Sequence, residues 1–223
     1  MAAAQVRVDA RPAPGAPVPA ASAGFDRVSI YDAAPSAAAP KGAYEQVDYA
    51  NLDDIIVWLE PMGAASATTP PAQRPQVIKL DPRKRDGAVH AVSVGQRVTF
   101  ENRSRVPLSL YSVSDANEFD LNPVAPGASA EFVVRSTGLI EVLADPAKPP
   151  VARLYAAPTS HVVRTRAGRT VTFTDVPPGA YRAVAWHPRL PGSSADVTLA
   201  AGQVGNTSVT VGVAALRDAR AGR

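Results

Sequence analysis

Proline and glycine interrupt the apolar segments of this chain so often that long helices are excluded. The 223 residues include 22 prolines and 15 glycines, and a proline inside a helix removes a hydrogen bond and clashes with the preceding turn. Between these residues lie short runs rich in Val, Ile, Leu and aromatic residues, several of which alternate with period two. Such runs, bounded by Pro, Gly, Asn or Asp, predict β-strands.

The predicted strands are numerous and closely spaced. We expect them at 27–31, 54–59, 76–80, 88–94, 97–100, 108–112, 129–134 and 138–143, and again at 152–156, 161–165, 170–173, 180–186, 196–199 and 206–211. Strands at this spacing are typical of a sandwich or a Greek-key barrel. The sequence therefore predicts an all-β protein.

Charge and residue types exclude several classes of function. The formal net charge is +3 and the arginines are scattered, so the chain offers no concentrated basic face to a nucleic acid. The chain has no cysteine, which excludes disulfides, thiolate zinc sites, a cysteine nucleophile and a thiolate-bound copper. No stretch of sequence is long and apolar enough to cross a bilayer as a helix.

The order of the segments predicts four regions. Residues 1–26 are rich in Ala and Pro and should form an extended tail, because they hold too little apolar bulk to offset the entropy lost on ordering. Residues 27–157 should form the main β-sandwich, with extra strands at its N-terminal side. Residues 158–213 should form a smaller β module, followed by a tail at 214–223. The start of the chain lacks the segments of a signal peptide. The protein is therefore either cytoplasmic or a mature form whose signal was removed ahead of Met1, and we expect the second.

A series of short motifs resembles one family. An early strand, Ile56-Val57-Trp58-Leu59-Glu60, is followed by Phe100-Glu101-Asn102, Phe119-Asp120-Leu121, Ala125-Pro126-Gly127, Val176-Pro177-Pro178-Gly179-Ala180-Tyr181 and Ala185-Trp186-His187. In this order and spacing they resemble bacterial plastocyanin-like proteins of the methylamine-utilisation type. The resemblance implies a cupredoxin-like Greek-key sandwich over about 52–157. It also implies a smaller module similar to transthyretin-like or carboxypeptidase-regulatory domains, and export from the cytoplasm.

The positions that would bind copper in such a domain have lost their ligands. A type 1 copper site needs a histidine in one loop and a thiolate, a second histidine and usually a methionine in another. The first position falls in 105–109, which reads Arg-Val-Pro-Leu-Ser, and the second loop, 142–151, contains no Cys, His or Met. Leu143 stands near the thiolate position, and Asp145-Pro146 stands where His-Pro would be. The resemblance therefore implies a cupredoxin domain without copper, and we expect no cofactor.

The remaining residues give no positive sign of catalysis. The three histidines, His90, His161 and His187, lie on separate predicted strands without a paired spacing. No Gly-x-Ser-x-Gly elbow and no glycine-rich phosphate loop occurs. We expect His187, which follows Trp186 at a strand end, to pack or cap at the junction between the two modules.

We hypothesise a non-catalytic periplasmic or extracellular protein, an accessory subunit that contacts other envelope or extracellular proteins, within a larger assembly. The two copper-site loops should lie together at one end of the sandwich, so the candidate binding residues are Pro107, Leu108, Tyr111, Asp145, Pro146, Lys148 and His187. One alternative is a β-sandwich that binds a carbohydrate or small ligand. The other is a metal-dependent enzyme or metal carrier that uses histidines and carboxylates.

Overall fold

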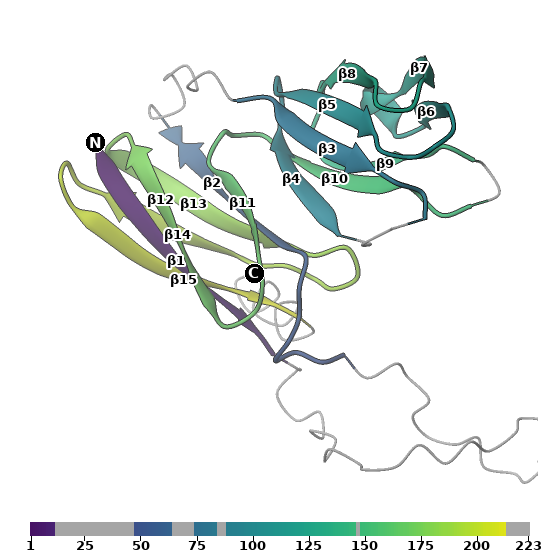
Figure 1. Cartoon of the computed structure of the whole chain (residues 1–223). Helices are drawn as coiled ribbons and strands as arrows, with labels where there is room; N and C mark the ends of the chain where they lie inside the picture. Colours follow the sequence, from purple (N-terminus) through teal and green to yellow (C-terminus); the bar gives the residue numbers. More distant parts are fainter. Residues whose placement is uncertain (12–46, 64–73, 84–87, 146–147, 213–223) are drawn as a thin grey trace, which may run out of the picture.

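The structure, a computed structural model, describes residues 1–11, 47–63, 74–83, 88–145 and 148–212. These residues form strands in two lobes, which Figure 1 shows side by side. The all-β prediction is confirmed. The predicted strand at 27–31, the loop at 64–73 and the tail at 214–223 lie outside the described residues. Among the described residues, no helix could cross a membrane.

The first lobe, which we call the cupredoxin-like lobe, is a sandwich of two facing sheets. One sheet has the order β3-β5-β8; the other begins β4-β10-β9 and continues into the β6-β7 pair through an antiparallel bridge between Tyr111 and Leu143. β3 runs parallel to β5 and β4 parallel to β10, whereas β8 and β9 run antiparallel to their partners. This is the strand order of a cupredoxin-like Greek-key sandwich. The strands are β3 (Gln76–Leu80), β4 (Val89–Ser93), β5 (Arg97–Asn102), β6 (Leu108–Ser112), β7 (Phe119–Val124), β8 (Ser129–Val133), β9 (Gly138–Val142) and β10 (Ala152–Ala157).

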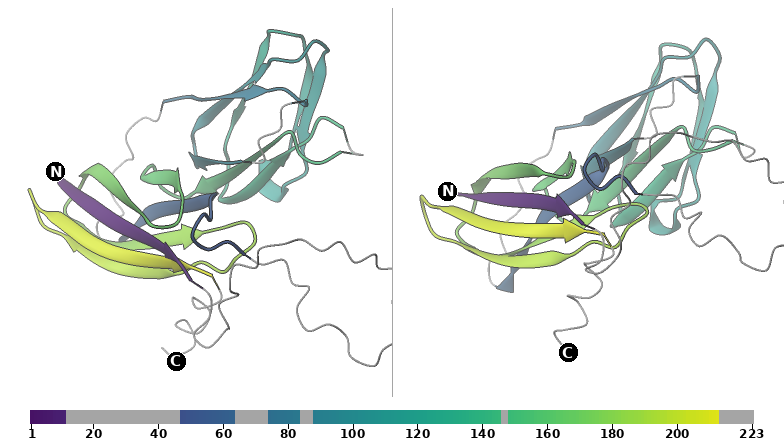
Figure 2. Two further views of the ribbon diagram at one scale, coloured as in Figure 1. Left: turned by 60° about the horizontal axis from the view of Figure 1, so that its bottom comes forward. Right: turned by 90° about the horizontal axis from the view of Figure 1, so that it is seen from below.

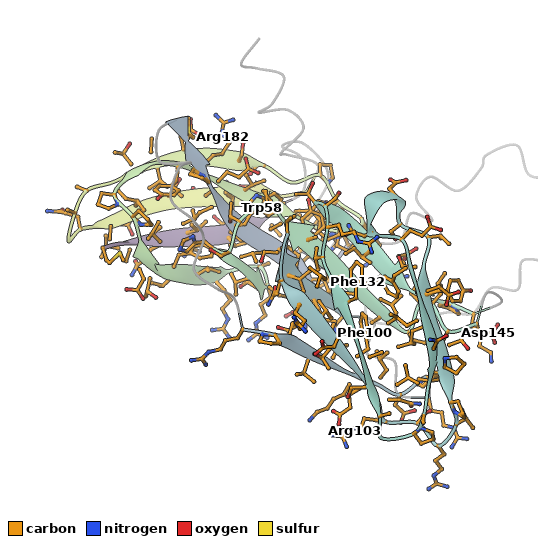
Figure 3. All side chains as sticks on the ribbon, turned by 90° about the horizontal axis from the view of Figure 1, so that it is seen from above. Trp58, Phe100, Arg103, Phe132, Asp145 and Arg182 are labelled. Carbon is orange, nitrogen blue, oxygen red and sulfur yellow. The ribbon has the colours of Figure 1, made fainter. Side chains whose placement is uncertain are left out.

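An aromatic and aliphatic core fills this lobe. The ring of Phe119 lies 5.9 Å from that of Phe100 and 4.5 Å from that of Phe132. Ile140 and Leu154 are fully buried beside them. Figure 3 places Phe100 and Phe132 inside the lobe. Alternation along each strand explains this core, because every second side chain points inward.

The second lobe is also a sandwich of two sheets. Their orders are β12-β1-β15 and β11-β2-β13-β14. The strands are β1 (Ala2–Ala10), β2 (Ile55–Met62), β11 (Val162–Thr165), β12 (Arg169–Val176), β13 (Gly179–Trp186), β14 (Ser194–Leu199) and β15 (Val204–Val211). Tyr181 in β13 is buried, and its hydroxyl donates to the carbonyl of Pro177 at 2.9 Å. This bond resembles the tyrosine corner of Greek-key sandwiches and gives the Pro-Pro-Gly-Ala-Tyr motif a structural role.

Residues 2–10 contradict the prediction of an N-terminal tail. They form β1, the central strand of its sheet, antiparallel to β12 and parallel to β15. The side chains of Ala2, Ala4, Val6 and Val8 point into the core and are at most 6% exposed. The prediction of a tail was wrong because it took small side chains as a sign that the segment has no core position. Ala and Val pack between the two sheets here, although strands are usually recognised by larger apolar residues.

β2 also belongs to a different lobe from the one predicted. It lies in the second lobe, paired with β11 and β13, although the sequence placed it in the region 27–157. Ile55, Val57 and Leu59 face the core of the second lobe, whereas Ile56 and Trp58 face the cupredoxin-like lobe. A strand that is buried on both faces has a continuous apolar sequence rather than an alternating one. This burial explains the run Ile-Ile-Val-Trp-Leu.

The contact between the lobes is a cluster that we call the aromatic seam. Its members are Ile56, Trp58, Val89 and Ala157, with Ala91, Tyr155, Val162, Val184 and Trp186 packed against them. The ring of Tyr155 lies 5.4 Å from that of Trp58 and stacks on that of Trp186 at 4.1 Å. Burial raises the pKa of the Tyr155 hydroxyl, and the charge of Glu60 raises it further. The seam therefore joins β10 of one lobe to β2 and β13 of the other.

Candidate functional site

A cleft of about 740 Å³ opens at the edge of the aromatic seam. We call it the inter-lobe cleft, because both lobes line it. Its lining consists of Val47, Asp48, Asn51, Leu52, Asp53 and Asp54 from the segment before β2; Val89, Leu139, Glu141 and Arg153 from β4, β9 and β10; and His187, Pro188 and Arg189 after β13. Figure 2 shows the segment before β2 lying where the two lobes meet.

The segment before β2 is the first wall of the cleft, and the Asp54 side chain bonds it to both lobes. Its carboxylate oxygen Oδ1 accepts the backbone N–H of Val89 at 3.0 Å and the Nε–H of Arg164 at 2.7 Å. Val89 belongs to the cupredoxin-like lobe and Arg164, in β11, to the second. The backbone of Asp54 has a φ of 60°, a left-handed conformation that Asp tolerates better than most residues. The Asp54 side chain therefore connects this wall to both lobes.

The same wall carries a turn that Asp48 closes. Its carboxylate accepts the backbone N–H groups of Ala50 and Asn51 at 3.1 and 3.2 Å, and the Asn51 side-chain amide at 2.8 Å. Hydrogen bonds from the Asn51 side chain, then from its backbone, lower the pKa of Asp48. The Asp48 carboxylate is thus ionised, and its hydrogen bonds stabilise the turn.

The second wall is the outer face of β9 and β10. Ile140 and Val142 point into the core, so Leu139 and Glu141 point out towards the cleft. Arg153 in β10 is paired with Glu141 across the strands, with 3.0 Å between Nε and Oε1. Leu139 is 37% exposed. The second wall therefore exposes the apolar side chain of Leu139 beside the ion pair between Glu141 and Arg153.

The third wall is the loop that follows β13. His187 is 6% exposed, and its Nδ1 accepts the backbone N–H of Arg189 at 3.2 Å. Its ring also hydrogen-bonds the backbone of Asp53, across the cleft end. At Gly192 a Cβ would lie 1.8 Å from the carbonyl oxygen of Ala185, so only glycine fits where this loop crosses β13. The loop is therefore held at its start by His187 and passes close to β13 at Gly192.

The two loops that the family resemblance equates with a copper site, 105–109 and 142–151, lie elsewhere, and their described residues are at one end of the cupredoxin-like lobe. Tyr111 and Leu143 exchange backbone hydrogen bonds of 3.0 and 2.8 Å, and the antiparallel pairing carries both loops away from them on the same side. Pro107 is exposed, Leu108 is buried in the core and Tyr111 is half-buried. Asp145 forms an ion pair with Lys148 at 2.9 Å. Figure 3 shows Asp145 on the side of this lobe remote from Trp58.

Of the predicted binding residues that the structure describes, His187 alone lines the inter-lobe cleft. Pro146 lies outside the described residues. Sequence reasoning missed Asp53, Asp54, Glu141 and Arg153 as site residues. Alternation in β9 marks Glu141 as an outward residue, but nothing in the sequence shows that another lobe covers part of that face.

Asn102, the last residue of β5, organises the loop at 103–107 that follows this strand. Its fully buried side-chain amide donates to the carbonyls of Val106 and Val124 at 2.8 and 2.7 Å, and its oxygen accepts the N–H of Ser104 at 2.8 Å. The asparagine of the Phe-x-Asn motif is thus a structural residue that holds this loop in shape.

We expect Asn102→Ala to lower the free energy of unfolding by about 2–3 kcal/mol, because the buried carbonyl of Val124 and the N–H of Ser104 lose their partner. The carbonyl of Val106 keeps the hydrogen bond from the Ser104 hydroxyl. Urea denaturation followed by circular dichroism measures the change. The exposed Asn122, on β7, is the matched control, and Asn122→Ala should change stability by less than about 0.5 kcal/mol. Equal effects of the two substitutions would contradict this role of Asn102.

The described residues contain no group of three His, Asp or Glu side chains that could hold a metal ion. His161 instead packs edge-on against the ring of Phe173 at 6.4 Å. Burial lowers the pKa of His161, against a smaller opposing effect of Asp175. His187 is occupied by two hydrogen bonds. The alternative of a His and carboxylate metal site gains no support from these positions.

Comparisons with known proteins give no family match, and the solved structures found have low TM-scores. A scan against models of protein families finds no match, and a search of curated proteins finds none. Among solved structures, the chain is similar to a purple cupredoxin from Nitrosopumilus maritimus, at 18% identity and a TM-score of 0.30, over 38% of this chain and all of that one. It is also similar to a Cu(I) form of an amicyanin variant, at 19% identity and a TM-score of 0.31, over 47% of this chain and all of that one. The description of the lobe as cupredoxin-like rests on its strand order.

Proposed function

We propose that this chain is a non-catalytic binding protein that contacts other proteins through the inter-lobe cleft. Its cupredoxin-like lobe would be a copper domain whose ligands have been replaced, in a protein related to the plastocyanin-like family of the methylamine-utilisation type. The observation that carries the proposal is the cleft itself. It is the place where three separately fastened segments from two lobes meet around one open volume.

The polar groups of the cleft support binding rather than catalysis. A general acid or base must be free to exchange a proton with its substrate. Glu141 is paired with Arg153, Asp54 with Arg164 and the backbone of Val89, and Asp48 with its own turn. These carboxylates stabilise the walls of the cleft and leave none of the three poised for proton transfer.

The lining favours a segment of a protein over a carbohydrate. Sugar sites commonly stack the ring on an aromatic face, and the aromatic residues at the junction lie inside the seam instead. The cleft presents Val47, Leu139 and Pro188 among charged groups of both signs. Apolar contacts with a charged rim are typical of a protein interface. The partner we propose is an extended segment of another protein.

We also propose that the partner is an envelope or extracellular protein and that the two form part of a larger assembly. This rests on the resemblance to exported plastocyanin-like proteins. Fractionation of the source cells tests the location: the protein should be found with periplasmic or secreted markers, and recovery with cytoplasmic markers would contradict export.

A photo-crosslinking residue at Leu139 tests the binding site in an extract of the source cells. We expect one discrete adduct, which an excess of the unmodified protein suppresses and an excess of the Leu139→Arg protein does not. The matched control is the same crosslinker at Val77, which is 52% exposed on the outer face of β3. The same adducts from Val77, or none from Leu139, would contradict the proposed site.

A further inference from the structure

His187 is the one imidazole that lines the inter-lobe cleft. It follows Trp186, whose ring stacks on Tyr155 in the aromatic seam, and it begins the loop that forms the third wall. One ring nitrogen, Nδ1, accepts the N–H of Arg189 at 3.2 Å, and the ring also bonds the backbone of Asp53. The histidine thus ties the third wall to the first.

The bond to Arg189 requires a neutral ring. Nδ1 can accept a hydrogen bond only while it carries no proton, because both nitrogens of an imidazolium are donors. After protonation, the Nδ1–H would point at the N–H of Arg189. His187 is 6% exposed, so water has little access to accept a hydrogen bond from the Nδ1–H.

We propose that protonation of His187 opens the wall of the inter-lobe cleft, so that the protein holds its partner at neutral pH and releases it in acid. The release of a partner rests on the proposed function, whereas the opening of the wall does not. The class of device is a histidine switch, in which the charge of one buried ring breaks the bond that holds a loop. The bond to Arg189 is lost and the loop after β13 is released, while the bond to the Asp53 backbone, which favours the charged ring, is kept.

The charged groups around His187 act in both directions. Arg189 lies in the same loop and opposes a second positive charge, whereas the carboxylate of Asp54, on the first wall, favours it. On the second wall, Glu141 and Arg153 neutralise each other. Burial and then Arg189 lower the pKa of His187 from its ordinary 6.5, against smaller opposing effects of Asp54 and the Asp53 backbone.

The direction of this shift determines how stability depends on pH. When the folded pKa lies below the unfolded value, the unfolded chain binds the proton more readily. The stabilisation by neutral His187 is therefore complete above pH 6.5, and it is lost as the pH falls through the folded pKa. His161, whose pKa is also lowered by burial, acts in the same direction and must be separated by substitution.

NMR of the intact protein between about pH 7.5 and pH 5 tests the switch without any ligand. We expect the His187 ring to titrate and the hydrogen-exchange protection of the Arg189 amide to fall by at least about tenfold with the same midpoint. Protection that stays constant while His187 titrates would overturn the proposal. So would a ring that stays neutral down to the pH at which the chain unfolds.

Two variants separate the roles of the histidines. Asn at position 187 can accept the Arg189 N–H without titrating, so His187→Asn should keep the amide protected at acid pH. His161→Gln should leave the change at Arg189 intact. Loss of the change in His161→Gln, with its persistence in His187→Asn, would assign the switch to His161 and overturn the proposal.

Crosslinking from Leu139 at different pH values tests the release of the partner separately from the existence of the binding site. The adduct should weaken at least about fivefold between pH 7.5 and pH 5.5 in the unsubstituted protein and persist in His187→Asn. An adduct of constant yield, in a protein whose Arg189 amide does lose protection, would contradict release while leaving the cleft as a binding site. Absence of any adduct at every pH would contradict the proposed function alone.

Discussion

Val6→Asp is expected to unfold the second lobe. The Val6 side chain is fully buried at the centre of β1, between β12 and β15. The substitution removes about 1.5–3 kcal/mol of apolar burial and places a carboxylate in the core at a cost of several kcal/mol more. A total above about 4 kcal/mol is a large part of the stability of a typical domain. Circular dichroism and urea denaturation measure the loss.

Gln5→Asp is the matched control, on the neighbouring residue of the same strand. Gln5 is exposed and its strand partners are Thr172 and Asn206. The change should alter the free energy of unfolding by less than about 0.5 kcal/mol. If residues 1–10 were a tail, both substitutions would be harmless. Equal, small effects would therefore contradict the position of β1.

The all-β class could be predicted because it depends on local patterns. Turn residues and period-two alternation identify most strands of both lobes without any knowledge of their neighbours. β1 could not be found in this way, since the core places of Ala2 and Ala4 depend on two strands, β12 and β15, that lie far along the chain. Small side chains carry little strand signal of their own, and long-range pairing decides their burial.

Trp58→Ala is expected to lower the free energy of unfolding by about 3–5 kcal/mol, as large-to-small changes of buried aromatic residues do. Trp58 is 5% exposed in the aromatic seam, its ring packs on Tyr155, and its Nε1–H donates to Glu60 at 2.8 Å. Because this side chain faces the other lobe, its loss should also separate the unfolding of the two lobes. Differential scanning calorimetry should show one transition in the unsubstituted protein and two in the variant.

Trp58→Phe is the control for the seam. It keeps a ring against Tyr155 and loses the hydrogen bond to Glu60, so we expect a cost of about 1–2 kcal/mol and a single transition. A cost below about 1 kcal/mol for Trp58→Ala, with one transition retained, would show that the seam does not couple the lobes.

The candidate site was harder to predict than the fold. The sequence pointed to the copper-site loops, where Tyr111 and Leu143 do meet through the backbone. The sequence could not show the inter-lobe cleft, because its three walls come from different parts of the chain. Folding brings these segments together, and only then is it decided which side chains face the cleft. Asp54 illustrates the difficulty: it looks like a solvated acid in the sequence, yet its two partners are Val89 and Arg164. The prediction that His187 packs or caps at the junction came from the family resemblance of its Trp-His motif, and in the structure His187 lines the inter-lobe cleft.

The affinity for the partner captured from Leu139 tests most directly whether the inter-lobe cleft is the binding site. We expect Leu139→Arg, in the cleft, to weaken binding at least about tenfold. Lys148→Glu alters the remote end, where the exposed Lys148 pairs with Asp145, and should change the Kd by less than about twofold. The reverse result, with binding lost in Lys148→Glu and kept in Leu139→Arg, would move the site to the copper-site loops and contradict this account.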